Sequence, residues 1–383
     1  KKLGADALIS LNASPFEKKK YQRRHNIVQK RVSETGLPFL TVFSTGAQDD
    51  LVFDGGAFAY DGQGEVSFAD DLFSSVPKDI SFNMKFEGEI SKIACEEEQI
   101  YQAMIHGLRD YTAKNGFRKV VLGLSGGVDS VLSSVVAVDA LGAENVTVLL
   151  LPSEYTSDAS FKDAYDTIHA LGIAYETIPI KSAVGTILKE FSPIFENMPQ
   201  DLTEENIQSR LRGLYLMTYS NKFGAMVLTT GNKSEVAVGY ATLYGDMCGG
   251  YNVLKDIYKT EVYKLCHYRN ANLPHGALGS KGIKIPENVI IKAPTAELRP
   301  DQKDSDSLPE YDILDDILYR LIEEEQPIED IIQAGHTRDI VIKIWRLVHR
   351  AEYKRRQSAP GPKISKKSFT KERRYPISHS FSD

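Results

Sequence analysis

Residues 119–130 read KVVLGLSGGVDS, and this stretch decides the fold. The β-branched apolar run at 120–122 predicts a buried strand, and the apolar residues 131–140 predict a buried helix. Between them lies a glycine turn whose backbone can approach a ligand closely, because two adjacent glycines tolerate positive φ. The hydroxyls of Ser125 and Ser130 and the free N–H groups at the helix start favour an anion. The stretch therefore predicts an anion-binding turn, the glycine loop, between a strand and a helix.

The residues of the glycine loop indicate which anion it holds. Neither Lys-Ser nor Lys-Thr follows the glycines, which excludes a Walker A loop, and the GxGxxG spacing of a dinucleotide fold is absent. Asp129 would repel a phosphate unless a divalent cation lay between them, so it suggests Mg²⁺ on a polyphosphate. The alternative is a plain turn that joins strand to helix, because glycine turns are common in α/β folds.

The sequence SGGVDS resembles the pyrophosphate loop of the N-type ATP pyrophosphatases. These enzymes cleave ATP to AMP and pyrophosphate and use the adenylate to activate a carboxylate or carbonyl group. The loop alone does not identify one enzyme among the N-type ATP pyrophosphatases, because asparagine, GMP and argininosuccinate synthetases and tRNA-thiolating enzymes share it. The resemblance implies ATP contacts from Gly123, Leu124, Ser125, Gly126, Gly127, Val128, Asp129 and Ser130.

Length and composition limit the remaining possibilities. The 383 residues suggest two domains or one large domain. A net charge of −6, from 46 basic and 52 acidic residues, gives no reason to expect nucleic acid or a membrane as a partner. No apolar run reaches the roughly 18 residues of a membrane helix. Cys95, Cys248 and Cys266 share no CxxC spacing, which predicts a reducing, cytoplasmic setting without structural zinc or disulfides.

Strands and helices alternate after the glycine loop. Apolar spacing predicts a strand at 145–151, a helix at 157–171 and a strand at 174–180. Strands joined through helices pair in parallel, so we expect a doubly wound parallel sheet of α/β class. Ligands of such sheets lie at the carboxyl ends of the strands. This places the glycine loop, residues 152–156 and residues 229–232 on one rim.

A second set of motifs narrows the family. Residues 225–229 predict a strand, and 230–235 (TGNKSE) predict a turn and a helix start with Glu235 in the first turn. From about Cys95 onward, the chain resembles the NAD synthetases, whose domain has the adenine nucleotide alpha hydrolase-like fold. The stretches that carry this resemblance are 206–213 (NIQSRLRG), 230–235, 238–265 (VGYATLYGDMCGGYNVLKDIYKTEVYKL) and 292–318 (KAPTAELRPDQKDSDSLPEYDILDDIL).

The resemblance implies a two-step reaction. The nicotinate carboxylate of deamido-NAD attacks the α-phosphorus of ATP, which releases pyrophosphate, and ammonia then displaces AMP to give NAD. The implied catalytic residues are Asp129, Thr230 and Lys259, of which Thr230 and Lys259 also contact ATP. Asp129 and Glu235 would ligate Mg²⁺. On their own, Glu235 would more often stabilise its helix and Lys259 would more often be solvated.

Deamido-NAD needs a site of its own. The resemblance implies contacts from Asn206, Glu235 and Lys354, with Lys354 reaching across a subunit boundary of a homo-oligomer that shares its active site. Arg210 is a weaker candidate, because a surface arginine four residues from Asn206 is the usual alternative. Residues 343–374 hold twelve Lys or Arg and two Glu, a pattern that also fits a solvated face or a nucleic-acid patch. The acidic total and the lack of an RNA-binding module argue against the patch.

The N-terminal region carries a different resemblance. Residues 11–20 (LNASPFEKKK) and 45–66 (TGAQDDLVFDGGAFAYDGQGEV) resemble the last third of the nitrilase-like glutaminase domain of glutamine-dependent NAD synthetases. That family hydrolyses glutamine with a Glu, Lys and Cys triad, and we expect this sequence to begin after it, inside a partial α/β sandwich. The resemblance implies that Ser14 and Lys20 contact glutamine. The alternatives are a helix N-cap at Ser14 and a solvated Lys20.

These patterns predict three regions. Residues 1–75 would be the C-terminal part of the glutaminase domain, 76–95 a linker and 96–383 the synthetase domain. The polar stretch 299–308 is interpreted as a mobile cover over the adenylate, with an ordinary surface loop as the alternative. Further predicted elements are a helix end running into a buried strand at 3–11, strands at 39–43 and 51–53 around a turn at 45–50, and helices at 17–34, 96–114 and 311–322.

Three functions follow. The first is a glutamine-dependent NAD synthetase that uses ATP and Mg²⁺ to amidate deamido-NAD with nitrogen from glutamine or ammonia. The second is another ATP pyrophosphatase of this loop class, such as a tRNA-modifying enzyme, which predicts a nucleic-acid domain that we do not find in the sequence. The third is a non-catalytic nucleotide-binding homologue. Substitution of Asp129, Thr230 or Glu235 would indicate the third, and all three are present.

Overall fold

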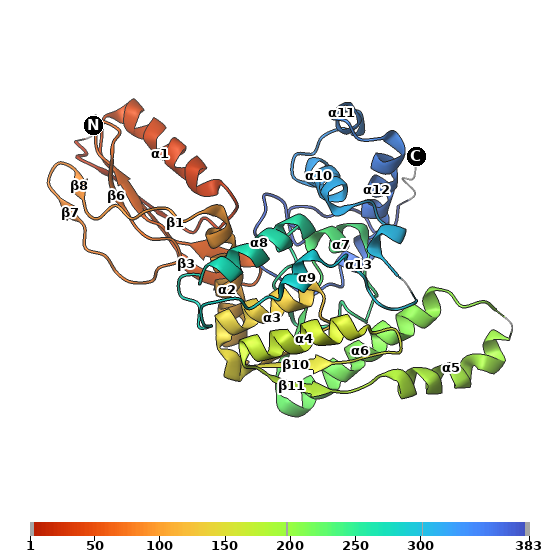
Figure 1. The fold of residues 1–383 in the computed structure, drawn as a ribbon. Helices are drawn as coiled ribbons and strands as arrows, with labels where there is room; N and C mark the ends of the chain where they lie inside the picture. Colours follow the sequence, from red (N-terminus) through yellow and green to blue (C-terminus); the bar gives the residue numbers. More distant parts are fainter. Residues whose placement is uncertain (1–3, 197, 301, 380–383) are drawn as a thin grey trace.

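The computed structural model describes residues 4–196, 198–300 and 302–379. Its N-terminal part is a mixed sheet of order β1-β2-β5-β6, in which β1 pairs with β2 in parallel and the other neighbouring strands pair antiparallel (Figure 1). The valines of helix α1 pack on one face of this sheet, against Phe58 and Tyr60. The elements are β1 (Leu8–Asn12), α1 (Lys20–Thr35), β2 (Phe39–Phe43), β5 (Phe58–Tyr60) and β6 (Val66–Ala69).

Three predictions in this part need correction. The strand predicted at 3–11 is buried on one face at most: Ile9 and Leu11 are 63% and 79% exposed, whereas the residues that alternate with them in β1 are partly buried, and residue 3 lies outside the described residues. The helix predicted at 17–34 begins only at Lys20. The turn predicted at 45–50 is mostly a strand, because β3 (Thr45–Gln48) pairs with β4 (Leu51–Asp54) as a hairpin.

The expected linker at 76–95 packs in part with the first sheet. Within it, β7 (Ser81–Phe82) pairs with β8 (Phe86–Glu87), and Phe86 is buried against Phe68 of β6. A bridge joins Ile90 to Ala69. Helix α2 (Glu96–Lys114) then begins where the sequence predicts.

The second sheet has five parallel strands in the order β11-β10-β9-β12-β13, which confirms the doubly wound α/β class. The chain winds outward from β9 to β11 and then returns to the other side of β9 as β12. The switch point between β9 and β12 is where such sheets form a crevice. The strands are β9 (Val120–Gly123), β10 (Val146–Leu150), β11 (Ala174–Thr177), β12 (Met226–Thr229) and β13 (Tyr251–Asn252).

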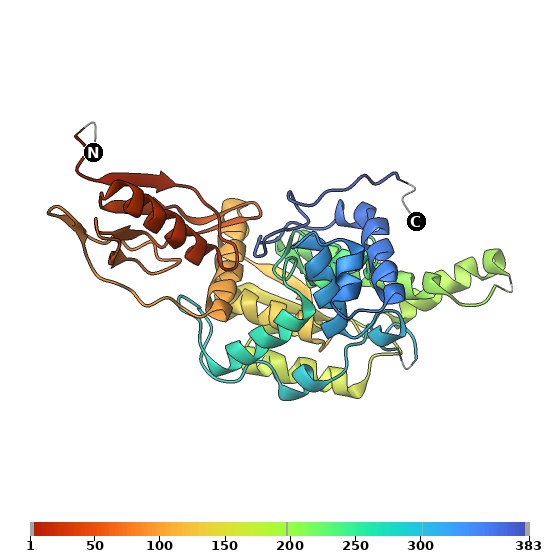
Figure 2. The ribbon, with the colours of Figure 1, turned by 90° about the horizontal axis from the view of Figure 1, so that it is seen from above.

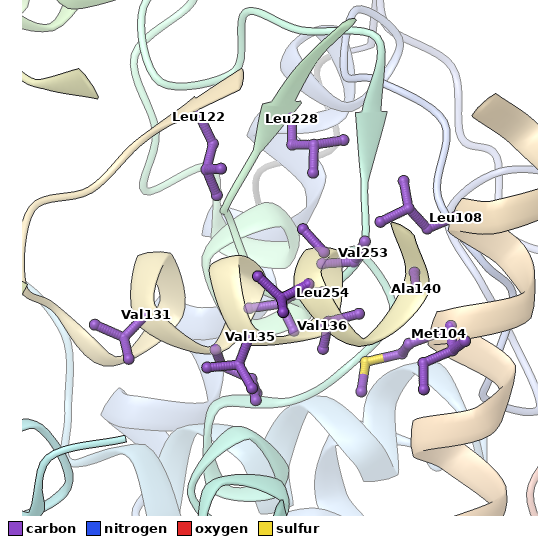
Figure 3. Packing of buried hydrophobic residues seen from close by; sticks show 14 of the residues in the cluster. Met104, Leu108, Leu122, Val131, Val135, Val136, Ala140, Leu228, Val253 and Leu254 are labelled. Carbon is purple, nitrogen blue, oxygen red and sulfur yellow. The ribbon is translucent and has the colours of Figure 1, made fainter. Parts of the chain in front are cut away.

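Helices cover both faces of the second sheet (Figures 1 and 2). On one face, α3 presents apolar side chains to α2 and to the sheet, as Figure 3 shows for Val136 and Ala140 near Met104. Burial of a valine or methionine side chain such as Val136 or Met104 contributes about 1.5–3 kcal/mol. The covering helices are α2, α3 (Val128–Leu141), α4 (Asp158–Leu171), α8 (Lys259–Ala271) and α9 (Glu287–Ile291) on this face, and α5 (Lys181–Phe195) and α6 (Leu202–Phe223) on the other.

The C-terminal helices form a separate cluster above the rim of the second sheet (Figure 1). They are α7 (Lys233–Val238), α10 (Tyr311–Ile322), α11 (Ile328–Gln333), α12 (Arg338–Arg350) and α13 (Glu352–Arg355). The 3₁₀ turn η2 (Asp304–Asp306) precedes α10, and the 3₁₀ turn η1 (Ala143–Asn145) joins α3 to β10. The chain after α13 returns to the β3–β4 hairpin, where Thr370 donates to the Asp50 carboxylate at 2.6 Å. Lys18 pairs with Glu261 of α8, which joins the two parts again. Within the described ranges, no helix combines the length and the apolar character needed to span a membrane.

Candidate active site

A cavity of about 290 Å³ opens at the carboxyl ends of β9, β10 and β12. It lies at the switch point, where the topology predicts a ligand. Its lining includes predicted residues Gly123, Leu124, Ser125, Gly127, Asp129, Ser130, Thr230 and Glu235, together with Thr156, Arg212 and Glu297. The glycine loop, the end of β12 and the start of α7 therefore face one space.

Hydrogen bonds within the glycine loop fix its shape. The hydroxyls of Ser125 and Ser130 lie 3.1 Å apart, and the N–H of Gly127 donates to the Ser125 hydroxyl at 3.2 Å. Gly126 has φ +80°, and a Cβ there would collide with the carbonyl oxygen of Ser160, so this position requires glycine. Gly126 and Val128 can therefore contact ATP only through main-chain atoms, because Gly126 packs on α4 and the Val128 side chain is buried in the core.

Three helix N-termini bring the charged residues together. Asp129 lies in the first turn of α3, Glu235 in the first turn of α7, and Lys259 is the first residue of α8. The Lys259 ammonium donates to Asp129 and lies 3.5 Å from Glu235 Oε1. Asn232 donates to Asp129 Oδ1 at 3.0 Å. Lys259 is 2% exposed, so the solvated alternative is wrong for it.

The ionisation of this cluster follows from its surroundings. Burial raises the pKa of Glu235 to about 8, and the negative charge of Asp129 adds to the shift. Burial alone would lower the pKa of Lys259, but the Asp129 and Glu235 carboxylates raise it above its usual value. The ammonium is therefore charged at neutral pH. Glu235 also accepts from the Asn232 N–H at 3.3 Å, so its helix-stabilising role and its place in the site coexist.

A smaller cavity of about 30 Å³ lies on the other side of Glu235. Glu235 and Asp246 line both cavities, and Lys354 lines the second. The Lys354 ammonium donates to the carbonyl oxygens of Gly239 at 2.8 Å and Ala241 at 2.6 Å. Within its own chain Lys354 thus lies beside Glu235, and the expectation that it reaches deamido-NAD across a subunit boundary stays a prediction.

Helix α6 carries the predicted residue Asn206, the weaker candidate Arg210 and a third polar residue near the site. Asn206 accepts from the Thr242 hydroxyl at 2.9 Å and lines neither cavity, and Arg210 donates to the Leu243 carbonyl. Arg212, which we did not single out, lines the first cavity. Burial lowers its pKa to about 10, so it stays charged at neutral pH.

The polar stretch at 292–308 also reaches the site. Glu297 accepts from the hydroxyl of Ser160 at 2.7 Å, and Lys292 lies 3.4 Å from the carbonyl oxygen of Gly126. Asp304 is 5% exposed, which the surface-loop alternative does not explain. Residue 301 lies outside the described residues. We missed Lys292 and Glu297, although both lie in the motif KAPTAELRP that carries the resemblance.

The two residues predicted to contact glutamine lie beside a buried ion pair. Arg24 pairs with Asp54 at 2.9 Å and also donates to the Ser14 hydroxyl at 3.2 Å. Lys20 donates to the Pro15 carbonyl at 2.9 Å. The N-cap of α1 is Lys19, so the alternative in which Ser14 caps this helix is wrong.

Asp129 and Glu235 fit a hard divalent cation. Mg²⁺ is commonly held by one or two carboxylates plus substrate phosphates, without a cage made only of protein. Both carboxylates already reach one cation, the Lys259 ammonium. In the part of the chain that the structure describes, no group of three or more His, Cys, Asp or Glu could hold a metal ion by itself.

Comparison with known proteins identifies the family. The family model for NAD synthase matches residues 100–358, which contain the second sheet, the glycine loop and the charged cluster. The chain belongs to the NAD synthase family. The match favours this family over another ATP pyrophosphatase, and the intact cluster gives no support to a non-catalytic homologue.

Two glutamine-dependent NAD(+) synthetases agree with this assignment, and one NMN synthetase also resembles the chain. A glutamine-dependent NAD(+) synthetase of Xanthomonas campestris is 47% identical and is matched over 99% of this chain and 68% of its own length. The ADP complex of the Acinetobacter baumannii glutamine-dependent synthetase has a TM-score of 0.73 and 42% identity, covering 98% of this chain and 68% of that one. An NMN synthetase of Francisella tularensis has a TM-score of 0.57 and 26% identity, covering 68% of this chain and 96% of that one.

Proposed function

We propose that the cavity at the switch point binds ATP, with the phosphates on the glycine loop and the α-phosphorus near Lys259. Family membership assigns the overall reaction, the ATP-dependent formation of NAD, and makes the chain a ligase. The observation that carries the proposal is the placement of Lys259 between Asp129 and Glu235, where three helix N-termini meet. Such positive groups stabilise the charge that develops during phosphoryl transfer.

The proposed chemistry has two steps. An oxygen of the nicotinate carboxylate of deamido-NAD forms a bond to the α-phosphorus, and the bond to pyrophosphate breaks. Pyrophosphate leaves with that electron pair and is held by Ser125, Ser130 and the main-chain N–H groups of the loop. Lys259 and Thr230 stabilise the charge on the α-phosphoryl oxygens. Ammonia then attacks the acyl carbon, AMP leaves, and loss of a proton gives NAD.

The proposal includes Mg²⁺ held by Asp129 and Glu235 with phosphate oxygens of ATP. When bound, the ion supplies charge neutralisation for the leaving pyrophosphate. Once the two carboxylates face a cation on the nucleotide, the Lys259 ammonium can turn toward the α-phosphate. The support for this division of roles is that one ammonium now occupies the space between both carboxylates.

Deamido-NAD would lie on the side of Glu235 that faces the second cavity. Lys354 lines that cavity, and Asn206 holds Thr242 in the segment beside it. Glu235 lines both cavities and so would contact the substrate where the carboxylate meets ATP.

We propose that nitrogen comes from glutamine as well as from ammonia, with Ser14 and Lys20 as contacts for glutamine. Relatives that match almost the whole chain are named glutamine-dependent NAD(+) synthetases. The proposed regions remain 1–75 for the glutaminase part, 76–95 for the connection and 96–383 for the synthetase. A cytoplasmic location stays a prediction from the cysteine content.

A homo-oligomer with a shared active site is proposed from the arm formed by α5 and α6. This arm projects from the body in both views (Figures 1 and 2). Helix α5 buries none of its residues, and Ile194 and Leu202, near the junction of α5 and α6, are 70% and 67% exposed. Large exposed apolar surfaces mark contact sites. Because α6 also carries Asn206 and Arg212, a second copy on this arm would adjoin the substrate site, and light scattering at known concentration would detect it.

The direct test is NAD formation by this chain from deamido-NAD, ATP and Mg²⁺, with ammonium and glutamine as separate nitrogen donors. Nicotinate mononucleotide is offered in parallel, because one structural neighbour is an NMN synthetase. The proposal expects NAD from deamido-NAD with ammonium and none from the Asp129→Asn variant. Faster amidation of nicotinate mononucleotide, or no pyrophosphate release with deamido-NAD, would contradict it.

A further inference from the structure

A buried group of two tyrosines and one aspartate adjoins Lys259. The Asp304 carboxylate accepts a hydrogen bond from the Tyr311 hydroxyl at 2.8 Å and a second from Tyr240 at 3.4 Å. Tyr240 follows α7, the helix that carries Glu235, and Tyr311 is the first residue of α10. Asp304 therefore joins the end of the α7 segment to the start of α10.

The ring of Tyr311 connects this group to the charged cluster. The Lys259 ammonium lies 5.2 Å from the centroid of the Tyr311 ring, within the range of a cation–π contact. Burial raises the pKa of the Tyr311 hydroxyl, so it remains a hydrogen-bond donor at neutral pH. A buried hydroxyl group needs a hydrogen-bond acceptor, and the acceptor described for Tyr311 is the Asp304 carboxylate. The direction of the ring toward Lys259 is thus tied to Asp304.

The Tyr311 contact gains importance when ATP binds. Without nucleotide, Asp129 and Glu235 hold the Lys259 ammonium. If these carboxylates turn to a cation on ATP, Lys259 loses both, and the Tyr311 ring is the described protein group left against it. A cation above a ring is stabilised most where water is excluded, and Lys259 is buried.

We propose that Asp304 is a positioning residue for the ATP site, which holds the Tyr311 ring against Lys259 while the carboxylates of the cluster face the nucleotide. This inference rests on the proposed function, because it needs ATP and a divalent cation in the cavity. Asp304 touches no substrate atom in this scheme and acts only through Tyr311.

The test measures ATP binding by calorimetry without deamido-NAD, so that no turnover occurs. Asp304→Asn and Tyr311→Phe should each weaken ATP binding about tenfold with Mg²⁺ and less than about twofold without it. Asp304→Asn should add less than about twofold in the Tyr311→Phe background. The matched control is Asp312→Asn, which neutralises an exposed carboxylate in the first turn of α10, the helix that begins with Tyr311, and it should change neither constant.

Each other outcome overturns the inference. Equal weakening with and without Mg²⁺ would mean that Asp304 only supports the fold, and circular dichroism identifies a variant that has not folded. Tyr311→Phe keeps the ring and the packing, so it provides the answer if Asp304→Asn does not fold. If the variants bind ATP as tightly as the wild type, and the wild type forms NAD, this inference alone is overturned. If the wild type does not bind ATP with Mg²⁺, the proposed function is overturned as well.

Discussion

Replacing Lys259 with methionine should destabilise the fold by an amount that grows with pH. The side chain is buried between two carboxylates, and removing one partner of a buried ion pair costs about 3–5 kcal/mol. We expect a loss near the lower limit, about 3 kcal/mol, at about pH 6.5. The reason is that Glu235, whose pKa is about 8, already carries a proton at this pH, so the loss of the ammonium does not leave it as an unpaired buried charge.

At higher pH we expect a larger loss of stability for Lys259→Met. In the wild type, the pKa of Glu235 is raised on folding. The stability that Glu235 contributes is therefore complete below its pKa in the unfolded chain and is lost as the pH rises through about 8. Without the ammonium, Glu235 holds its proton to still higher pH, so the variant loses more. One proton over one pH unit corresponds to about 1.4 kcal/mol, the extra loss expected at about pH 9.

Urea unfolding followed by circular dichroism at the two pH values measures both losses. Lys264→Met removes an exposed lysine of the same helix and should stay within about 0.5 kcal/mol of the wild type. A loss below about 1 kcal/mol, or a loss for Lys259→Met that is the same at both pH values, would refute the reasoning.

Three further predictions concern other parts of the chain. Asp129→Asn should lower pyrophosphate release at least about 100-fold in a coupled assay, and a rate close to wild type would remove this residue from catalysis. Gly126→Ala should destabilise the chain by about 1–3 kcal/mol in thermal unfolding, because its φ is positive and a Cβ collides with Ser160, whereas Gly185→Ala in open space on α5 should not. Burial lowers the pKa of His25 to about 4, so the stability that His25 contributes is complete above about pH 6.5 and is lost as the pH falls toward 4. His25→Phe should therefore flatten the dependence of the unfolding free energy on pH in this range. An unchanged slope would contradict the assignment.

Local sequence predicted the part of the site that lies on the rim of the second sheet. The strand, turn and helix patterns placed the glycine loop, with Asp129, and residues 229–232 on that rim, whereas the roles of Glu235 and Lys259 came only from the family resemblance. The parallel order of the second sheet followed from the alternation of strands and helices in the same way. These features depend on contacts between neighbours along the chain.

The features that sequence reasoning missed depend on packing between distant segments. Arg210 and Arg212 differ in role because of how α6 lies against β9, and periodicity does not say which arginine faces the cavity. Asp304 stands in a polar stretch that resembles a surface loop, yet two tyrosines from other segments bury it. Leu11 is apolar and 79% exposed although it lies in a strand, because the local pattern does not reveal which face of β1 other segments cover.

The most direct test of the central claim follows one oxygen atom. Deamido-NAD labelled with ¹⁸O in its nicotinate carboxylate is incubated with this chain, ATP, Mg²⁺ and ammonium, and the products are analysed by mass spectrometry. If the carboxylate attacks the α-phosphorus, one ¹⁸O appears in AMP for each NAD formed, and pyrophosphate is unlabelled. Label in inorganic phosphate together with ADP, or unlabelled AMP beside newly formed NAD, would contradict the adenylate chemistry assigned to this site.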